Sequence, residues 1–354
     1  MRIGHAPDNA GTRAFLVPGF VVLAAIWGSS FLFIKVAVAE LHPMYITLGR
    51  VALGAVTMLA LVAVLRDRLP RSPRVWLHLV VVGTIGVAIP FTLFGYGEQR
   101  IPSLLAGIWN ATTPLVALPL AVLVFRTEKL TLRRVVGIGI GFAGVLVVLG
   151  VWTGVGGATL SGQLMCFAAS AGYGVAIAYM KRFVTTGRSS GLALVAGQMI
   201  VATVVMAVVA PLTAGAPPTF DQLSGEVIGS MLALGALGTG VAHLIHYRNI
   251  RLVGASTASL VTYLIPLFAV LIGVVVLGES VTWYQPVGTL VVLSGIAITQ
   301  GLPLRRPQLA AGPLAAGEPP PASIAGAASA PAPGPAPPPG GPAPGTPAPA
   351  PGGQ

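Results

Sequence analysis

The sequence predicts an all-α membrane protein in which ten transmembrane helices form two inverted five-helix repeats. Three observations lead to this prediction: the composition, ten apolar stretches and an internal repeat. Of the 354 residues, 55% are hydrophobic and only 8% are charged, whereas an average soluble chain has about 25% charged residues. No soluble fold could bury so much apolar surface.

The ten apolar stretches give the helices one by one. A hydrocarbon core of about 30 Å needs roughly 20 apolar residues of helix. In chain order, the stretches are 15–38, 44–65, 75–96, 103–125 and 135–152, then 160–180, 192–214, 226–247, 255–277 and 281–300, some of which span only with tilt or fraying. Because five is an odd number, the second copy would enter the membrane from the opposite side, as in many secondary transporters.

The net charge of +11 follows the same topology. Of the 20 Lys and Arg residues, 17 lie in the tails or in alternate connections, whereas the connections on the other side hold one, Arg100. Lysine and arginine are retained on the cytoplasmic side of a membrane. We therefore expect a multi-pass protein of the plasma or inner membrane with both termini in the cytoplasm, and no nucleic-acid partner.

Other kinds of chemistry find no support in the sequence. The only cysteine, Cys166, excludes an intrachain disulfide and a cysteine metal cluster. A phosphate-cradling loop and a paired acid–base set are both missing from the sequence, so we expect no enzyme activity, no cofactor and no metal. Glu98, Glu128 and Glu279 all fall at predicted helix ends, so a carboxylate-based proton pump lacks a relay.

The two ends of the chain lie outside the repeats. Residues 1–14 carry Arg2 and Arg13 before an apolar run, as a signal peptide would, but the run lacks a convincing cleavage site. We therefore predict a cytoplasmic segment before a retained first helix. Pro, Ala and Gly dominate 302–354, which is typical of disorder. This tail is either a plain extension or a Pro-rich docking segment.

Matching residues at a fixed offset predict the duplication. An offset of 151 residues aligns the third to fifth helices of the two halves, and an offset of 146 aligns the first helices. The matches include Tyr96 with Tyr247, Arg100 with Arg251, Glu128 with Glu279, Gly28 with Gly174, Lys35 with Lys181, and Trp27 with Tyr173. We therefore predict one repeat over 15–152 and the other over 160–301.

Two short motifs stand out in these repeats. The first is Trp27-Gly28-Ser29-Ser30-Phe31 with Lys35 and Gly49-Arg50, and the second is Pro266-Leu267-Phe268 with Leu277-Gly278-Glu279 and Gly288. Together they resemble the EamA family of the drug/metabolite transporter superfamily over about residues 15–301, although Arg126-Thr127-Glu128 replaces the usual Leu-Gly-Glu in the first half. The resemblance implies a ten-helix inner-membrane carrier with a central cavity that moves small metabolites or drugs by alternating access.

The helix breaks predict part of the substrate site. Asn110 and Thr113 come just before Pro114, and Thr262 and Tyr263 come before its repeat mate Pro266. A proline bends a helix and frees carbonyls, and interrupted helices in corresponding positions of two halves point to a transporter site. We expect these four side chains to line a polar cavity near the midplane, with hydrogen bonding between helices as the alternative.

Arg50 and Trp27 complete the predicted substrate-binding set. Arg50 lies inside the second apolar stretch, where an ionisable group must face a partner or water. It either binds an anion or gates the pathway, or it is a structural arginine that is capped by carbonyls or snorkels outwards. His243 and His246 share one face of the eighth helix and could relay protons, although interfacial water could equally satisfy His246.

The predicted function is a secondary transporter, and more narrowly an exporter. Its predicted partners are a small-molecule substrate and membrane lipid. The sequence leaves open whether the protein forms a homodimer. A lipid-intermediate flippase with a lateral opening between helices is the alternative within transport. A membrane receptor or scaffold that docks through the Pro-rich tail is the alternative from another class. Deletion of residues 302–354 separates these classes, because a carrier keeps transport and a docking scaffold loses its activity.

Overall fold

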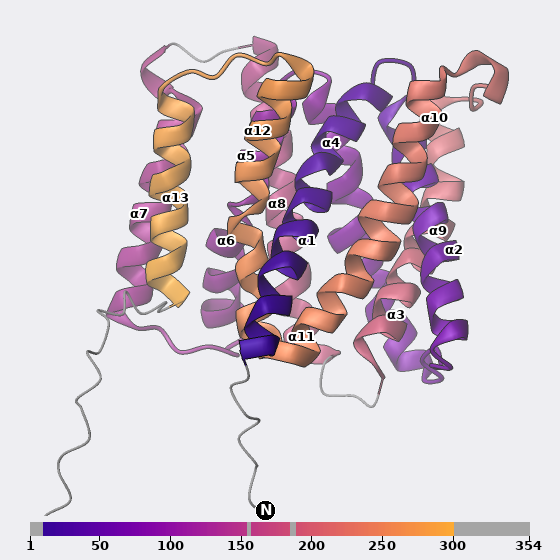
Figure 1. Cartoon of the computed structure of the whole chain (residues 1–354), viewed down its shortest axis with the longest axis horizontal. Helices are drawn as coiled ribbons and strands as arrows, with labels where there is room; N and C mark the ends of the chain where they lie inside the picture. The colour runs from indigo at the N-terminus through magenta and orange to yellow at the C-terminus, as the bar shows by residue number, and fades with distance from the viewer. Residues whose placement is uncertain (1–9, 154–156, 185–188, 301–354) are drawn as a thin grey trace, which may run out of the picture. The chain divides into compact units, whose positions relative to one another are not determined.

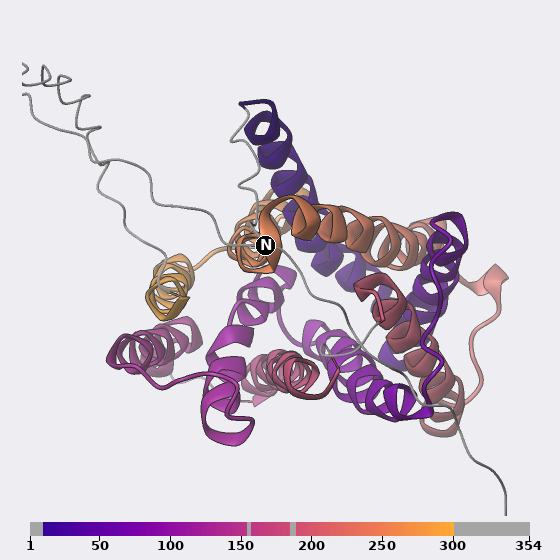
Figure 2. The same ribbon diagram turned by 90° about the horizontal axis from the view of Figure 1, so that it is seen from below.

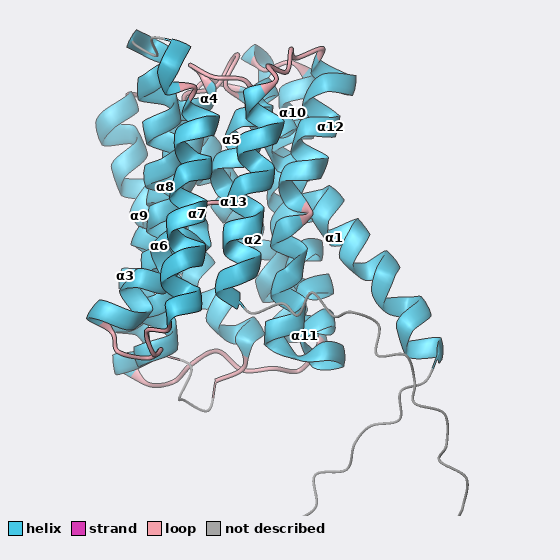
Figure 3. Ribbon diagram, turned by 90° about the vertical axis from the view of Figure 1, so that its left-hand side faces the viewer, coloured by secondary structure: helices cyan, strands magenta, loops and turns pink. Residues whose placement is uncertain are grey.

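The computed structural model describes residues 10–153, 157–184 and 189–300 (Figure 1). Every regular element in these ranges is helical, as Figure 3 shows by colour. The described chain begins and ends at the same end of the bundle, the lower end in Figure 1, as an even number of crossings requires. The predicted tail 302–354 and most of the predicted segment 1–14 lie outside the described residues.

Ten spans cross the bundle, as predicted. The first repeat comprises α1 (Ala10–Ala37), α2 (Pro43–Val64), α3 (Pro73–Gly83) with α4 (Ile89–Glu98), α5 (Ser103–Asn110) with α6 (Thr113–Pro119), and α7 (Leu132–Leu149). The second comprises α8 (Gly157–Phe183), α9 (Gly191–Ala214), α10 (Gly225–Leu232) with α11 (Ala242–Ala258), α12 (Ile265–Leu277), and α13 (Tyr284–Gln300). Eight spans are long and apolar enough to cross a membrane, and the last two are shorter.

Short irregular turns interrupt two of the described spans, the third and the eighth, and lie at the ends of others or between them. The π-helical turns are η1 (Thr84–Ala88) between α3 and α4, η2 (Leu120–Val124) after α6, and η5 (Ala233–Val241) between α10 and α11. The 3₁₀ turns are η3 (Val151–Thr153), η4 (Phe220–Gln222) and η6 (Ser259–Tyr263). The offset of 151 places η1 on residues 235–239, the middle of η5, so the helical hydrogen bonding of the third and eighth spans changes at the same depth. Such π turns occur often at functional sites.

One predicted connection is wrong. We expected a loop over 248–254 between the eighth and ninth spans, but α11 continues to Ala258 and leads directly into η6. In the first repeat, the corresponding turn precedes α5, and Pro102 stands at its N-cap with an extended ψ of 150°. The second repeat has Val253 at the matching position. Because valine keeps its backbone donor and its helical conformation, the helix is free to continue.

The packing of the spans is the same when the two repeats are exchanged. α1 packs against α12, and its mate α8 packs against α6; α8 packs against α4, and α1 against α10 and α11. Three pairs join a span to its own mate: α2 with α9, α5 with α12, and α7 with α13. Figures 1 and 2 both show α7 and α13 side by side. Since each repeat has five spans, mates run in opposite directions, which gives the predicted inverted repeat.

Glycines set the closest helix contacts, and they too are paired. A Cβ on Gly28 of α1 would stand 2.6 Å from the Cβ of Phe268 and 3.1 Å from the carbonyl oxygen of Ile265 in α12. A Cβ on Gly174 of α8 would stand 3.1 Å from the carbonyl oxygen of Thr113 in α6. Gly137 and Gly144 of α7 likewise face the backbone of α13, as small residues at helix contacts in membranes do.

Candidate substrate site and gates

The two predicted helix breaks are present, and they lie in spans that pack against each other. In the fourth span, Asn110 ends α5 and Thr113 begins α6, with the Thr113 hydroxyl donating to the carbonyl of Asn110 over 2.8 Å. In the ninth span, Thr262 and Tyr263 lie in η6, just before α12. α5 packs against α12. The hydroxyl of Tyr263 is buried without a hydrogen-bond partner among the described residues, so it is available to a ligand.

Trp27 lies between the first span and the eighth. Its indole Nε1 donates to the carbonyl oxygen of Gly238 in η5 over 3.2 Å. Its ring lies 5.9 Å from the ring centre of His243 and 5.2 Å from that of His246. His246 keeps a buried Nδ1 with no partner in the described part of the chain. The contact between the first and eighth spans therefore combines an aromatic ring with a buried nitrogen that has no hydrogen-bond partner among the described residues.

Arg50 is buried in α2, and its guanidinium carbon lies 3.8 Å from the centre of the Phe91 ring. An arginine stays charged in a protein, and stacking on an aromatic face stabilises that charge. Within the described ranges, no carboxylate forms an ion pair with Arg50 and its Nε has no hydrogen-bond partner. Tyr173 and His243 are close enough to interact with it electrostatically. The bundle interior therefore holds an unpaired positive charge.

The six predicted residues fall into three groups. Trp27 and Arg50 both neighbour His243, Asn110 and Thr113 form the break of the fourth span, and Thr262 and Tyr263 form that of the ninth. No hydrogen bond or ring contact between described residues joins Asn110 to Tyr263. Whether all six line one cavity stays a prediction.

An aromatic cluster near Arg50 was missed in the sequence. The ring of Phe94 lies 5.5 Å from that of Phe31 and 6.0 Å from that of Tyr173, and Phe91 lies 6.4 Å from Tyr173. The sequence contained one signal for it, since the repeat offset pairs Tyr173 with Trp27, a predicted site residue. The spacing of Phe91 and Phe94 on α4 alone is typical of core packing.

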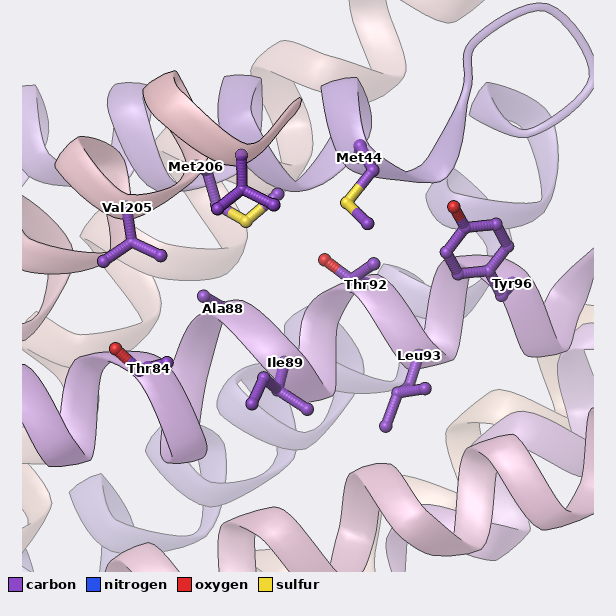
Figure 4. Close-up of a pocket in the computed structure, with 10 residues that line it drawn as sticks. Met44, Thr84, Ala88, Ile89, Thr92, Leu93, Tyr96, Val205 and Met206 are labelled. Atoms are coloured by element: carbon purple, nitrogen blue, oxygen red, sulfur yellow. The ribbon is translucent and has the colours of Figure 1, made fainter. Parts of the chain in front are cut away.

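A separate pocket of about 300 Å³ lies between α2, α4 and α9, and Figure 4 shows the residues that line it. It contains none of the six predicted site residues and no charged side chain. The residues around it come from α2, η1, α4 and α9: Met44, Thr84, Ala88, Ile89, Thr92, Leu93, Tyr96, Val205, Met206 and Val209. Its apolar lining suits hydrocarbon better than a polar solute.

At one end of the bundle, which we call the Glu98 end, Lys35, Glu98, Ser103 and Glu279 join four spans. The Lys35 ammonium donates to the carbonyls of Glu98, at 2.6 Å, and of Ile101, at 2.9 Å, which closes the end of α4. The Glu279 carboxylate accepts from the backbone N–H of Ser103 at 2.6 Å and of Leu104 at 2.9 Å, and from the Ser103 hydroxyl at 3.0 Å. A carboxylate at a helix N-terminus satisfies amides that would otherwise lack partners. Glu279 therefore caps α5.

The opposite end, which we call the Glu128 end, has a different arrangement of the matching residues. Lys181, the mate of Lys35, forms an ion pair with Glu128, the mate of Glu279, and Arg134 binds the same carboxylate at 2.8 Å. Its hydrogen bond to Lys181 is the largest cause that lowers the pKa of the Glu128 carboxyl, and Arg134 adds to the effect. Glu128 thus binds cations here rather than helix amides.

Comparisons with known proteins agree with this architecture. The model of the EamA-like transporter family matches residues 15–150 and 160–300. The chain is 28% identical over 286 residues to an uncharacterized transporter of Archaeoglobus fulgidus, covering 79% of this chain and 97% of that protein. It is 27% identical over 277 residues to the uncharacterized inner membrane transporter YedA of Escherichia coli K12, covering 75% and 85%. A crystal structure of a protein with 20% identity superposes with a TM-score of 0.58 over 82% of this chain and 97% of the other, which shows a shared fold.

Proposed function

Because this chain belongs to the EamA-like transporter family, we propose that it is a secondary carrier of small organic molecules that works by alternating access between its two repeats. In this proposal, the Glu98 end faces the outside and the Glu128 end faces the cytoplasm. The excess of Lys and Arg in the connections at the Glu128 end supports that orientation.

One observation carries the proposal: equivalent residues of the two repeats are engaged differently at the two ends. Lys35 and Glu279 hold the ends of α4 and α5 closed, whereas Lys181 and Glu128 bind each other. The turn between the eighth and ninth spans, whose amides Glu128 would cap, is missing, because α11 continues through that position. In any one state of an alternating carrier, one end is closed and the other is open. Equivalent residues at the two ends must therefore make different contacts, as they do here.

The opposite state follows by exchanging the repeats. Glu128 would then cap the start of the ninth span near Gly254, while Glu279 and Lys35 release α5 and α4. The structure corresponds in this scheme to the state that is closed at the Glu98 end. Substrate exchange would then take place at the Glu128 end.

Arg50 defines the class of substrate in the proposal. An unpaired buried guanidinium attracts a carboxylate or another anionic group, and the rings of Phe91 and Trp27 with the Tyr263 hydroxyl suit a molecule that also has an apolar part. A thermal-shift screen of the purified protein tests this class, with organic anions, amino acids, nucleosides, sugars and cationic drugs as separate sets. The direction in which any ligand from this screen is transported across the membrane of vesicles then tests the predicted export.

The gates are tested without knowing the substrate, because the native chain has a single cysteine. Cys166 is fully buried at the Glu98 end, where a Cβ on Gly97 of α4 would collide with its sulfur. In right-side-out vesicles, a membrane-impermeant maleimide should label Cys166 only when this end opens. We expect Glu279→Gln to speed labelling, because it weakens the gate that is closed here. The matched variant Glu128→Gln should slow labelling, because the capping contacts that it removes from the opposite state outweigh the partly exposed ion pairs that it removes here.

Two results would contradict the proposal. If both variants change labelling in the same direction, or neither changes it, the two glutamates are not gates of opposite states. If labelling occurs only in inside-out vesicles, the proposed orientation is wrong.

A further inference from the structure

The carboxyl group of Glu98 is buried and unpaired. Glu98 is the last residue of α4, and 0% of its surface is exposed. Neither carboxyl oxygen has a hydrogen-bond partner within the described residues. The sequence correctly indicated that Glu98 ends a helix, but it gave no sign that the surrounding spans cover it completely.

Charged groups surround Glu98 without pairing with its carboxyl. Lys35 from α1 binds the backbone carbonyl of Glu98 rather than the side chain. Arg50 from α2, Cys166 from α8 and Glu279 before α13 interact with it electrostatically. α5 and η1, which also adjoin α4, have no ionisable side chain. The other titratable groups on α4 and on or near the neighbouring elements at this half of the bundle are Glu40, His42, Tyr45, Tyr96, Arg100 and Tyr173.

The carboxyl groups of Glu98 and Glu279 differ in the hydrogen-bond donors around them. Glu279 accepts three hydrogen bonds, two of them from helix amides, and such donors stabilise a negative charge. Glu98 has no donor, and a buried charge without a partner or hydrogen bonds is strongly unfavourable. Glu98 is therefore neutral in this state.

The second repeat has a neutral residue at the corresponding position. The offset of 151 pairs Glu98 with Asn249, which is 3% exposed and has an Nδ2 without a partner among the described residues. A neutral polar side chain is therefore accommodated in both repeats, but only the first repeat has one that can ionise.

We propose that Glu98 is a proton-binding site whose occupancy keeps the Glu98 end closed, a proposal that rests on the alternating access proposed above. When this end opens, water reaches the carboxyl group, which lies one residue before the exposed Gln99. The proton passes to this water, and Lys35, released from the two carbonyls, pairs with the carboxylate. Re-closure requires the proton to return, because the closed end offers the charge no donor.

A proton fits this site better than a metal ion does. A bound cation such as Ca²⁺ needs six or more oxygen ligands, and Zn²⁺ needs about four ligands. The described residues contain no group of three or more His, Cys, Asp or Glu side chains that could hold a metal. The ammonium of Lys35 already binds the carbonyls of Glu98 and Ile101, which could otherwise serve as ligands.

The experiment measures Cys166 labelling as a function of external pH in wild type and in Glu98→Gln, which is neutral at every pH. We expect the ratio of the wild-type rate to the Glu98→Gln rate to rise several-fold with pH, because ionised Glu98 favours opening. Taking the ratio removes the ordinary increase of thiol reactivity with pH. An ionised carboxylate next to the thiol would itself slow thiolate formation, so this direct effect has the opposite sign.

Two controls make the result decisive. Glu226→Gln removes an exposed carboxylate at the same end of the bundle and should leave the wild-type pH dependence unchanged. Infrared spectra in lipid should show a protonated-carboxyl band at neutral pH in wild type that Glu98→Gln lacks. A ratio that stays flat with pH, or a band that Glu98→Gln retains, overturns the proton site. If Glu279→Gln still speeds labelling in that case, the alternating gates stand and only the role of Glu98 fails.

Discussion

Adding one methyl group to Gly144 should weaken the contact between the fifth and tenth spans. A Cβ at this position in α7 would stand 2.6 Å from the backbone nitrogen of Val292 and 2.9 Å from the carbonyl oxygen of Gly288. Ordinary van der Waals contacts begin near 3.4 Å, so α13 must move away by about 0.8 Å. Overpacking of this kind costs about 1–3 kcal/mol, and here the obstacle is backbone, which cannot rotate aside.

Gly139 in the same helix is the matched control. A Cβ there meets nothing within 4 Å, and alanine is favoured over glycine in a helix by about 0.5–1 kcal/mol. Gly139→Ala should therefore be neutral or stabilising. The two variants make the same chemical change in one helix, so the gain in helix propensity is common to both. We therefore expect their stabilities to differ by the overpacking cost alone, about 1–3 kcal/mol.

The assay is the SDS concentration at which the purified protein unfolds, followed by circular dichroism. Gly288→Ala should match Gly144→Ala, since its Cβ would stand 2.7 Å from the backbone nitrogen of Val148 and 3.0 Å from the Gly144 carbonyl. The double variant Gly144→Ala with Gly288→Ala should lose less stability than the sum of the two single variants, because the first methyl group already moves the two helices apart. If Gly144→Ala and Gly139→Ala unfold at the same SDS concentration, the close contact between α7 and α13 at Gly144 is refuted.

Three further predictions concern the site and the gates. Asn110→Leu should abolish transport while membrane insertion stays normal, since Leu suits the bilayer better than Asn; wild-type transport would make Asn110 a packing residue. Arg50→Gln should abolish the thermal shift given by an anionic ligand and Arg50→Lys should keep part of it, because lysine retains the charge but not the planar contact with Phe91; full binding by Arg50→Gln would make Arg50 structural. The pKa of Glu128 is lowered below its ordinary value of 4.5 mainly by Lys181, so its stabilising effect is present above that value and is lost as the pH falls through the lowered pKa. Glu128→Gln should therefore flatten the loss of thermal stability below about pH 4.5, which differential scanning fluorimetry would show, and an unchanged acid profile would contradict the ion pair.

The sequence predicted the features that depend on local pattern. Apolar length located the ten spans, and the offsets of 151 and 146 residues identified the mates that pack equivalently, including Gly28 and Gly174. These signals succeed because a helix in lipid must satisfy its own backbone and because a duplicated helix keeps its packing face.

Other features depend on contacts between distant spans, and the sequence did not contain them. Glu279 stands at a helix end in sequence, but only the fold brings it to the amides of Ser103 and Leu104. Glu98 also stands at a helix end, where water is the ordinary expectation, and it is buried because α1, α2 and α8 enclose it. The continuation of α11 was readable in principle, since the sequence shows that Pro102 has no counterpart in the second repeat.

The difference between Pro102 and Val253 also makes the two gates unequal. At the Glu98 end, Pro102 holds an extended backbone before α5 in every state, so Glu279 always has free amides to cap. At the Glu128 end, Glu128 gains amides to cap only if α11 opens near Gly254, which costs helical hydrogen bonds, although glycine lowers the cost by tolerating non-helical backbone. Under the proposed alternation, closing the Glu128 end therefore requires more energy than closing the Glu98 end. Val253→Pro would remove that cost, and in the Cys166 assay it should raise labelling, because it stabilises the state in which the Glu98 end is open. Slower labelling by this variant would show that a break in α11 does not belong to the gate.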